Sequence, residues 1–383
     1  MSKRNLHDKA IIAGIGQTEF SKESGRSELQ LAAEASAAAI ADAGLTPDAI
    51  DGMVTFTLDT SDELHLIRCL GIPDIRWWSR TPHGGGGANT TMLHAVAAVA
   101  SGAANNVLIW RAFNERSGNR FGQPNNQTTP PGWNWYLPFG LDTPAKIYSL
   151  TFQRYMDTYG VSNEDFGRYS VVARKHAATN PNAWFYQRPI TLEDHQSSRW
   201  IVEPILRLLD CCQESDGGVA LIVSAAERAA DLPQPAVRVL GITDAHLQDG
   251  SVMFNYYLPD LEQYAECYRA SERLWEMTGL RPHEMDVVTI YENFTPIVFQ
   301  QLEGYGFCKA GEARDYIMDG NIELDGATPV NPHGGLLGEA YIHGVNNVIE
   351  GVRQIRGAAA NQVDGAETVL VAGGRGGMVL GRA

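Results

Sequence analysis

A run of four glycines, residues 84–87, stands at the start of a segment that is typical of a helix. It lies within the stretch HGGGGANTT, residues 83–91, which an apolar helical pattern and then a strand pattern follow. A glycine-rich turn ahead of a helix can hold a phosphate, because unsatisfied N–H groups and the helix dipole point there. The same field can lower the pKa of a thiol and so create a nucleophile. The stretch contains neither Lys nor Cys, so the loop can shape a site but cannot supply a covalent nucleophile.

The thiols and imidazoles of the chain show no pattern of a metal site. The cysteines are odd in number and form no CxxC pair, and the ten histidines form no HExxH or comparable spacing. Reduced thiols of this kind are typical of a reducing compartment and argue against a disulfide framework or a zinc cluster. We therefore expect no metal and no cofactor.

The composition is that of a globular protein with a substantial core. Of its 383 residues, 44% are hydrophobic and 20% are charged. A formal net charge of −15 argues against nucleic acid as a partner, since phosphate binding needs clustered Lys and Arg. The N-terminus lacks a signal-peptide pattern, and no window is long and apolar enough to span a bilayer. We expect a soluble, cytoplasmic protein.

Two distant parts of the chain resemble one another. Residues 44–51, GLTPDAID, precede the strand pattern GMVTF, and residues 279–286, GLRPHEMD, precede the strand pattern VVTIY. A second echo follows in the same order: PHGGGG begins at Pro82 and PHGG at Pro332, each ahead of a helix and a strand. Similar elements in the same order indicate a duplicated α/β unit. The alternation of strands and helices favours a layered α/β fold.

We place the first half at residues 1–250 and the second at residues 255–383. The first half contains an insertion, residues 113–217, that includes the aromatic run NQTTPPGWNWYLPFG. A long excursion of this kind is usually functional. It could be a lid, a dimer contact or the wall of a substrate pocket. Its apolar side chains suit each of these roles, namely Trp133, Trp135, Tyr136 and Phe139.

Residues 180–225, and above all their stretch DCCQESDGGVAL, resemble the sterol-carrier-protein-type thiolases. Two related α/β halves with a loop insertion in the first are also the plan of the thiolase fold. The resemblance implies four catalytic groups: a Cys after the glycine loop, a His in a motif that ends in Phe, a His in a GHP motif, and a second Cys near the C-terminus. A thiolate of this kind would form the acyl-enzyme, and the histidines would hold oxygens and move protons.

All four thiolase groups are missing from this chain. The nucleophile position falls within Gly84–Ala88, which holds no Cys, and the second Cys would lie near Val371 or Ala372. Tyr291, in YENF, and Tyr341, in NPHGGLLGEAYIHG, stand at the two histidine positions. Acyl transfer through a cysteine is therefore excluded at this site, and a different reaction on the same scaffold is indicated.

The pattern most resembles the thiolase-like aldolases of steroid side-chain degradation, particularly in the run that begins at Glu339, EAYIHGVNNVIEGVRQIRG. The resemblance implies retro-aldol cleavage of a tertiary β-hydroxyacyl-CoA to a ring ketone and propionyl-CoA. Such a reaction needs a base for the hydroxyl proton, donors for the thioester enolate and an acid to protonate it. We assign Tyr341 to the hydroxyl proton and Tyr291 to the enolate carbon, although the sequence also allows the reverse.

A phenol has an ordinary pKa near ~10, so as a base it needs a neighbouring donor or cation. By proximity in the sequence we expect that help from His333, His343 or Glu292. His333 or the backbone N–H groups of the glycine loop could form the oxyanion site. The candidate catalytic residues are thus Tyr291, Tyr341 and His333. The supporting residues are Glu292, Asn293, His343, Gly85 and Gly86.

The resemblance also implies partners. The substrate would be an acyl-CoA, the chain would form a homodimer, and a small accessory protein with an OB-fold and a zinc ribbon would join it. Two other functions stay open at this point. One is a non-catalytic scaffold that binds acyl-CoA, and the other is a thiolase or acyltransferase with a displaced cysteine such as Cys308. Iodoacetamide should abolish a thiolase and spare an aldolase.

Overall fold

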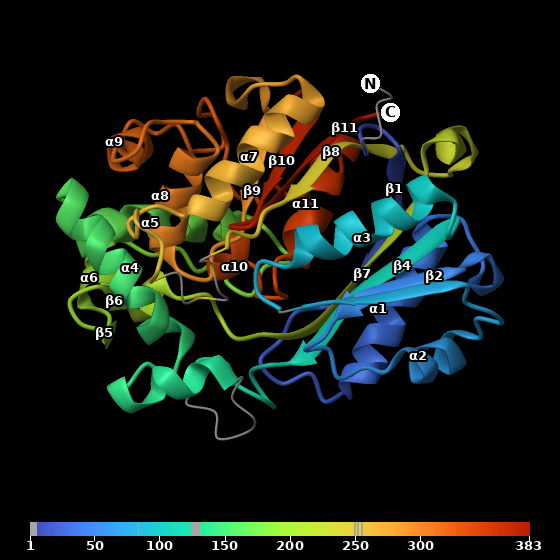
Figure 1. Ribbon diagram of the computed structural model, residues 1–383, viewed down its shortest axis with the longest axis horizontal. Coiled ribbons are helices and arrows are strands. Elements are labelled where there is room, and N and C mark those ends of the chain that lie inside the picture. The colour runs from blue at the N-terminus through green and yellow to red at the C-terminus, as the bar shows by residue number, and fades with distance from the viewer. Residues whose placement is uncertain (1–5, 83, 124–130, 249, 251–252, 254–255) are drawn as a thin grey trace.

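The computed structural model describes residues 6–82, 84–123, 131–248, 250, 253 and 256–383. Within these residues nine strands form one sheet in the order β3-β2-β4-β7-β1-β8-β11-β10-β9 (Figure 1). Its strands are β1 (Ala10–Gln17), β2 (Gly52–Phe56), β3 (Trp77–Thr81), β4 (Asn106–Asn114), β7 (Asp216–Ala225), β8 (Val237–Asp244), β9 (Val287–Ile290), β10 (Thr368–Ala372) and β11 (Gly376–Arg382). The remaining two, β5 (Trp200–Val202) and β6 (Leu206–Arg207), pair with each other.

The sheet consists of two blocks that repeat one topology. In the first block β2 and β4 pair in parallel, and in the second β9 and β10 do the same. In the described sheet, the backbone pairing between the two blocks is that of β1 with β8, and it covers Ala10–Ile12 of β1. The predicted duplication of an α/β unit is confirmed. The predicted domain bounds, 1–250 and 255–383, stay a prediction, and β8 pairs with β11 of the second block.

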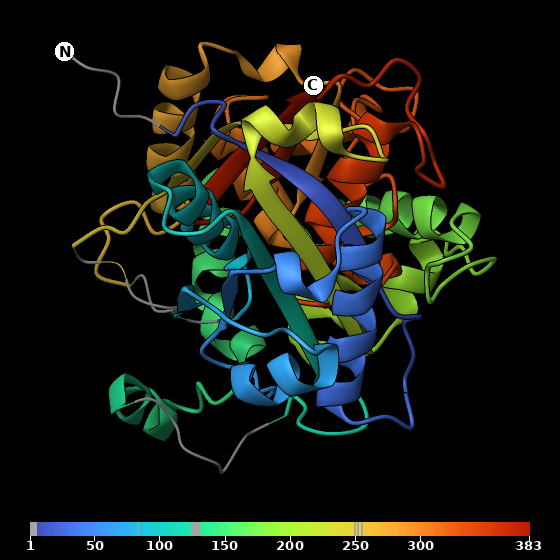
Figure 2. The ribbon, with the colours of Figure 1, turned by 90° about the vertical axis from the view of Figure 1, so that its right-hand side faces the viewer.

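The helices cover and separate the two blocks. They are α1 (Glu28–Asp42), α2 (Glu63–Leu70), α3 (Ala88–Ser101), α4 (Pro144–Tyr159), α5 (Asn163–Thr179), α6 (Leu192–Ser197), α7 (Ala265–Thr278), α8 (Thr295–Gly304), α9 (Ala313–Met318), α10 (Gly335–Gly338) and α11 (Val345–Arg356). Buried residues of α3 and α11 share one core with strands of both blocks. Helices α1 and α2 pack on the outer face of the first block, and α7 and α8 pack on that of the second (Figure 2).

The first sequence echo occupies equivalent places in the two halves. Gly44 and Gly279 follow α1 and α7 with φ of 66° and 73°, in the left-handed region that glycine adopts at little cost. A short 3₁₀ turn and then β2 or β9 comes next in each case. The second echo is less exact, because residues 84–87 lead directly into α3, whereas the PHGG segment leads into α10 and α11 begins only at Val345.

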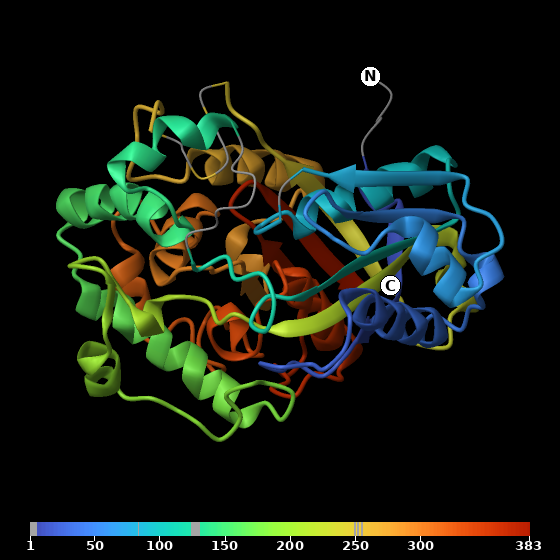
Figure 3. The same ribbon diagram turned by 90° about the horizontal axis from the view of Figure 1, so that it is seen from below.

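The insertion leaves the first block after β4 and returns to it at β7. Between them it carries α4, α5 and α6, and α5 packs against α8 and α10 of the second half (Figure 3). Its returning end runs beside the second half. There the backbone of Cys211 forms an isolated antiparallel β-bridge with that of Phe294, and the backbone of Glu214 forms a parallel one with that of Tyr341. The insertion thus covers the place where the two halves meet.

Candidate active site

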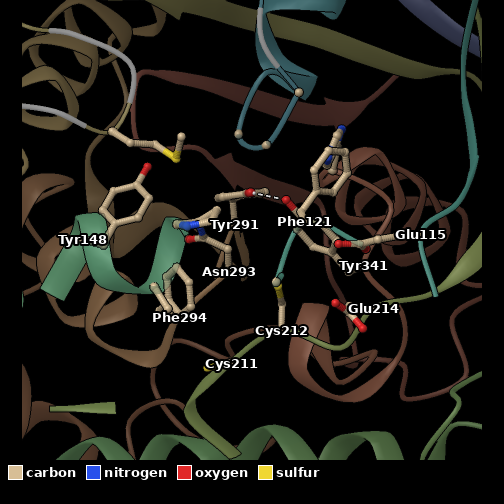
Figure 4. A pocket seen from close by; sticks show the side chains of 18 of the residues that line it. Glu115, Phe121, Tyr148, Cys211, Cys212, Glu214, Tyr291, Asn293, Phe294 and Tyr341 are labelled. Carbon is tan, nitrogen blue, oxygen red and sulfur yellow. Dashed lines mark hydrogen bonds between the residues drawn. The ribbon is translucent and has the colours of Figure 1, made fainter. Parts of the chain in front are cut away.

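Two tyrosines from separate loops meet at the centre of the molecule. Tyr291 directly follows β9, and its N–H donates to the Ala372 carbonyl at 2.9 Å. Tyr341 follows α10, and its N–H donates to Ser215 Oγ at 3.2 Å. Their hydroxyl oxygens lie 2.9 Å apart, within hydrogen-bond distance, and both side chains are buried (Figure 4). The sequence prediction that these two residues act at one place agrees with this geometry.

The glycine loop lies directly against this pair. A β-carbon added at Gly85 would stand 2.1 Å from Tyr291 Oη and 2.8 Å from Tyr341 Oη. Gly86, with φ of 75°, has the Tyr291 ring at 3.6 Å from the same hypothetical position. Gly84 meets the ring of His343 instead, at 2.3 Å. At Gly84 and Gly85 aromatic side chains thus occupy the space that a side chain would need, and at Gly86 the left-handed backbone favours glycine.

The pair faces a cavity of about 1120 Å³. The insertion, the glycine loop and the loops after β9 and α10 all contribute to its lining. Figure 4 shows labelled side chains of the insertion and of the loop after β9 around the hydrogen-bonded pair of Tyr291 and Tyr341. Its apolar lining includes Phe121, Trp133, Trp135, Tyr148, Phe294 and Leu337. Trp133, Trp135 and Tyr136 of the insertion line the cavity, as the pocket-wall interpretation requires, whereas Phe139 is largely exposed.

Burial raises the pKa of both tyrosines well above the ordinary value. Burial therefore favours the neutral form of both phenols, and either hydroxyl can be the donor of the hydrogen bond between them.

The lining also includes His343, and a hydrogen bond from Arg111 shows which nitrogen of its ring carries the proton. Arg111 Nε donates to His343 Nδ1 at 3.0 Å. Because a guanidinium only donates, Nδ1 must be the unprotonated nitrogen, and a neutral imidazole then carries its proton on Nε2. Burial and the neighbouring Arg111 hold the pKa of His343 well below its usual range. The imidazole of His343 is therefore neutral and cannot be the cation that would help a tyrosine act as a base.

His333 and Glu292 do not belong to the described lining of the cavity. His333 is buried with Nε2 at 3.3 Å from Asn347 Oδ1, and burial lowers its pKa to about 3. Glu292 is buried as well, and its Oε1 accepts the N–H of Leu336 at 2.7 Å. The structure thus brings neither to the tyrosine pair, and the predicted oxyanion role of His333 has no support from its position. Asn293, by contrast, does line the cavity.

Several lining residues were not singled out from the sequence. Glu115 is buried, and burial together with Glu214 raises its pKa well above the ordinary value. Lys22 lines the same side, and burial lowers its pKa to about 8. Cys211 and Cys212 also line the cavity, and burial raises the pKa of both thiols. Cys308 is outside the described lining, and burial also raises its pKa.

The basic residues of an acidic chain gather at this cavity. The chain as a whole has 30 Lys and Arg against 45 Asp and Glu. The lining reverses the ratio, because it includes three acidic residues, Glu115, Asp142 and Glu214, against six basic ones. The basic residues are Lys22, Arg116, Arg120, Arg174, Arg199 and Arg375. A local excess of positive charge attracts an anionic ligand.

The fold and the site together define a thiolase-fold protein without the thiolase nucleophile. Residues 256–382 match the family described as thiolase C-terminal domain-like. The solved structure of human mitochondrial 3-ketoacyl-CoA thiolase shares the fold, with a TM-score of 0.70, 14% identity and 99% of each chain covered. The predicted fold class, two duplicated α/β halves of the thiolase type, is confirmed.

Nearer relatives narrow the assignment. The chain is 53% identical to the steroid side-chain-cleaving aldolase of Thermomonospora curvata, with 98% of each chain covered. It is 50% identical to 17-hydroxy-3-oxo-4-pregnene-20-carboxyl-CoA lyase of Mycobacterium tuberculosis, over 98% of this chain and 100% of the relative. A solved structure described as an Ltp2-ChsH2(DUF35) aldolase has a TM-score of 0.94 at 52% identity, with 98% of each chain covered. The chain belongs to this family of thiolase-fold aldolases, and the predicted resemblance is confirmed.

The described residues contain no helix that is both long and apolar enough to cross a membrane. They also contain no group of three or more His, Cys, Asp and Glu side chains suited to a metal ion. The cytoplasmic location and the homodimer stay predictions.

Proposed function

We propose that this aldolase cleaves a tertiary β-hydroxyacyl-CoA whose hydroxyl carbon belongs to a steroid ring, and releases a ring ketone and propionyl-CoA. The observation that carries the proposal is the pair of hydroxyls of Tyr291 and Tyr341, 2.9 Å apart in a large cavity and against a glycine loop that has no thiol. The proposed substrate class comes from the name of the relative from Mycobacterium tuberculosis, 17-hydroxy-3-oxo-4-pregnene-20-carboxyl-CoA lyase.

The two phenols can move the required proton without ionising. Tyr341 Oη accepts the proton of the substrate hydroxyl and passes its own to Tyr291 Oη, which passes its own to the substrate α-carbon. Meanwhile the bond between the α-carbon and the hydroxyl carbon breaks, a C=O bond forms at the ring, and a C–H bond forms at the α-carbon. Atoms and charge balance, and both tyrosines return to their neutral forms. Burial that opposes a free phenolate does not oppose this transfer.

We assign Tyr341 to the substrate hydroxyl and Tyr291 to the enolate carbon. Either hydroxyl can donate in the hydrogen bond between them, so the partial reactions of the two phenylalanine variants decide the order of the two roles.

The cavity suits both ends of such a substrate. Its aromatic and aliphatic lining fits a fused ring system, since apolar pockets bind through buried area. Its six basic residues fit the phosphates of CoA. The proposed chemistry uses side chains alone and requires no cofactor.

We also propose a homodimer and an accessory protein of the DUF35 type. The solved relative is described as an Ltp2-ChsH2(DUF35) aldolase, so an assembly of this kind is known for a chain 52% identical to this one. The small OB-fold and zinc-ribbon partner that we expect from the sequence would occupy that role.

The experiment uses the chain purified together with such a partner and a 17-hydroxy-3-oxo-4-pregnene-20-carboxyl-CoA substrate. The ring ketone and propionyl-CoA are followed by mass spectrometry. Equal amounts of both products support the proposal, and Tyr341→Phe should abolish them while it leaves binding of the ester intact. Binding without cleavage in the wild type would instead favour a scaffold. Of the thiols that a displaced-cysteine thiolase could use, Cys308 lies outside the described lining, whereas Cys211 and Cys212 line the cavity and have their pKa raised by burial.

A further inference from the structure

A buried chain of polar groups leads from the protein interior to the cavity. Asp59 Oδ2 pairs with Arg111 Nη1 at 2.9 Å, and both side chains are almost fully buried. Arg111 Nε then donates to His343 Nδ1 at 3.0 Å. A buried ion pair is costly unless its remaining donors are satisfied. The imidazole satisfies the Nε–H of Arg111 and in return is held in one tautomer.

The ring of His343 is fixed in orientation as well as in protonation. It packs against Phe113 and Phe121, with ring centroids 4.9 and 5.4 Å away, and it makes a T-shaped contact with Tyr341 at 5.2 Å. The backbone of His343 has φ of 51°, a left-handed conformation that is uncommon for residues other than glycine. Such strain persists only where the surroundings determine it, and it is often found at functional sites. The residue is thus held rigidly at the wall of the cavity.

The N–H that remains is placed beside the reacting groups. Nε2 carries the proton because Nδ1 accepts from Arg111. The imidazole of His343 lies against Gly84 of the glycine loop. Tyr341 precedes His343 by two residues in the chain, and its ring contacts the imidazole. The thioester oxygen is bonded to the carbon next to the α-carbon that Tyr291 protonates. It must therefore lie close to the tyrosine pair, and so beside this wall.

We propose that His343 is a neutral hydrogen-bond donor that holds the thioester oxygen through Nε2–H as the enolate forms, and that Arg111 is the positioning residue that keeps it so. The inference rests on the proposed function and deepens it. A donor fixed before the reaction stabilises developing negative charge without reorganisation. A neutral donor also keeps its proton, so it does not compete with Tyr291 for the enolate carbon.

Two substitutions at the same position distinguish a donor from a packing residue. The amide nitrogen of His343→Gln reaches to the place of Nε2, whereas that of His343→Asn reaches only to the place of Nδ1. Asparagine tolerates left-handed φ better than glutamine does. A purely structural role therefore favours His343→Asn, and a donor role favours His343→Gln.

The assay follows cleavage and, separately, exchange of the α-hydrogens of propionyl-CoA with D₂O, which needs only enolate formation. We expect His343→Asn to lose about 10²- to 10³-fold in kcat and in exchange. His343→Gln should recover most of both rates, with similar melting temperatures for the two variants. Full cleavage in His343→Asn, or equal loss in both variants, would overturn the proposal. Loss of cleavage with intact exchange would overturn the assignment to the thioester oxygen.

The positioning role of Arg111 has a spectroscopic test. In protein labelled with ¹⁵N-histidine, the His343 signals should report a single Nε2–H tautomer. Arg111→Lys keeps a cation for Asp59 but loses the donor to Nδ1, so both tautomers should appear and kcat should fall more than KM changes. An unchanged tautomer in Arg111→Lys would overturn this role. If the wild type does not cleave the ester, the proposed function fails on its own, while exchange and the ¹⁵N signals still test His343.

Discussion

A β-carbon on Gly85 would stand 2.1 Å from the hydroxyl oxygen of Tyr291. That distance is far inside the contact of a carbon and an oxygen, so no side chain fits at residue 85 while Tyr291 holds its position. A side chain at residue 85 and the observed position of Tyr291 therefore exclude each other.

Gly85→Ala should disable the enzyme without disrupting the loop backbone. Gly85 is not among the glycines with positive φ, so alanine meets only the two hydroxyls. The tyrosines must shift, and a displacement of about 1 Å at reacting groups can cost on the order of 10²-fold in kcat. Cleavage assays and thermal melts check this expectation.

The control for Gly85→Ala is Gly87→Ala. Gly87 has φ of −87°, and its added β-carbon would meet Gly84 and Phe56 rather than the tyrosines. It should keep most of the activity. A double-mutant cycle adds a second check, because Gly85→Ala should destabilise the Tyr291→Phe variant less than it destabilises the wild type. Equal destabilisation in both backgrounds would show that the clash with Tyr291 is not the cause.

Tyr291→Phe and Tyr341→Phe should both abolish cleavage but differ in a partial reaction. Each removes one link of the proton path, which is expected to cost about 10²- to 10⁴-fold in kcat. Exchange of the propionyl-CoA α-hydrogens with D₂O requires the residue that faces the α-carbon. Tyr291→Phe should therefore lose exchange completely. In Tyr341→Phe the Tyr291 hydroxyl can pass its proton to water in place of Tyr341 as it takes the α-proton, so exchange should only slow.

The partial reaction also tests the order of the two roles. If Tyr341→Phe lost exchange and Tyr291→Phe kept it, the assignments would have to be reversed. Phenylalanine keeps the ring packing of both residues, including the contact of Tyr341 with Phe113. Melting temperatures near that of the wild type would confirm that the loss is chemical.

The tyrosine pair was found through a resemblance, because Tyr291, in YENF, and Tyr341, in NPHGGLLGEAYIHG, stand where the thiolases have their histidines. The layered α/β fold followed from the internal repeats and from the alternation of strands and helices. Both inferences depend on chain order, which the fold preserves.

The sequence could not assign the imidazoles, because their roles depend on the direction of the side chain. His333 lies in the motif PHGG, yet Gly334, with φ of 100°, redirects the chain and the ring bonds to Asn347. Arg111 stands in an apolar strand pattern, and only its contact with His343 shows its use. Glu115 and Cys212 were overlooked for the same reason, since nothing in their neighbourhood marks the side that faces the cavity.

Cys212 changes how an alkylation experiment must be interpreted. Its thiol lines the cavity, and burial raises its pKa, so it reacts slowly but blocks the site once modified. We expect prolonged iodoacetamide treatment to inactivate the aldolase gradually, faster at high pH, although no thiol takes part in the chemistry. Inactivation alone therefore does not identify a thiolase, contrary to the expectation from sequence.

Cys212→Ala separates blockage from chemistry. The variant should cleave the ester at a rate close to that of the wild type and should resist iodoacetamide. Cys267→Ala is the matched control, because Cys267 is buried in a core away from the described cavity lining and should leave the sensitivity unchanged. A Cys212→Ala enzyme without activity would place this thiol in the reaction and contradict the proposed mechanism.

Glu350 on α11 makes the stability of the fold depend on pH. Burial and the nearby Glu339 raise its pKa from 4.5 to about 8, although Gln354 bonds to it at 2.8 Å. A carboxyl of raised pKa keeps its proton in the folded state and loses it on unfolding above about pH 4.5. The unfolded state thus binds fewer protons, so stability falls as pH rises from about 4.5 to about 8 and then levels off.

Glu350→Gln should remove this part of the pH dependence, because the amide resembles the neutral carboxyl. The free energy of unfolding of the variant should exceed that of the wild type by an amount that grows by about 1.4 kcal/mol per pH unit between those limits. Thermal melts at pH 5, 6, 7 and 8 measure the difference. Glu367→Gln, at an exposed position, should follow the wild type at every pH. Parallel curves for Glu350→Gln and the wild type would mean that Glu350 is ionised in the folded protein, and that α11 accommodates its charge.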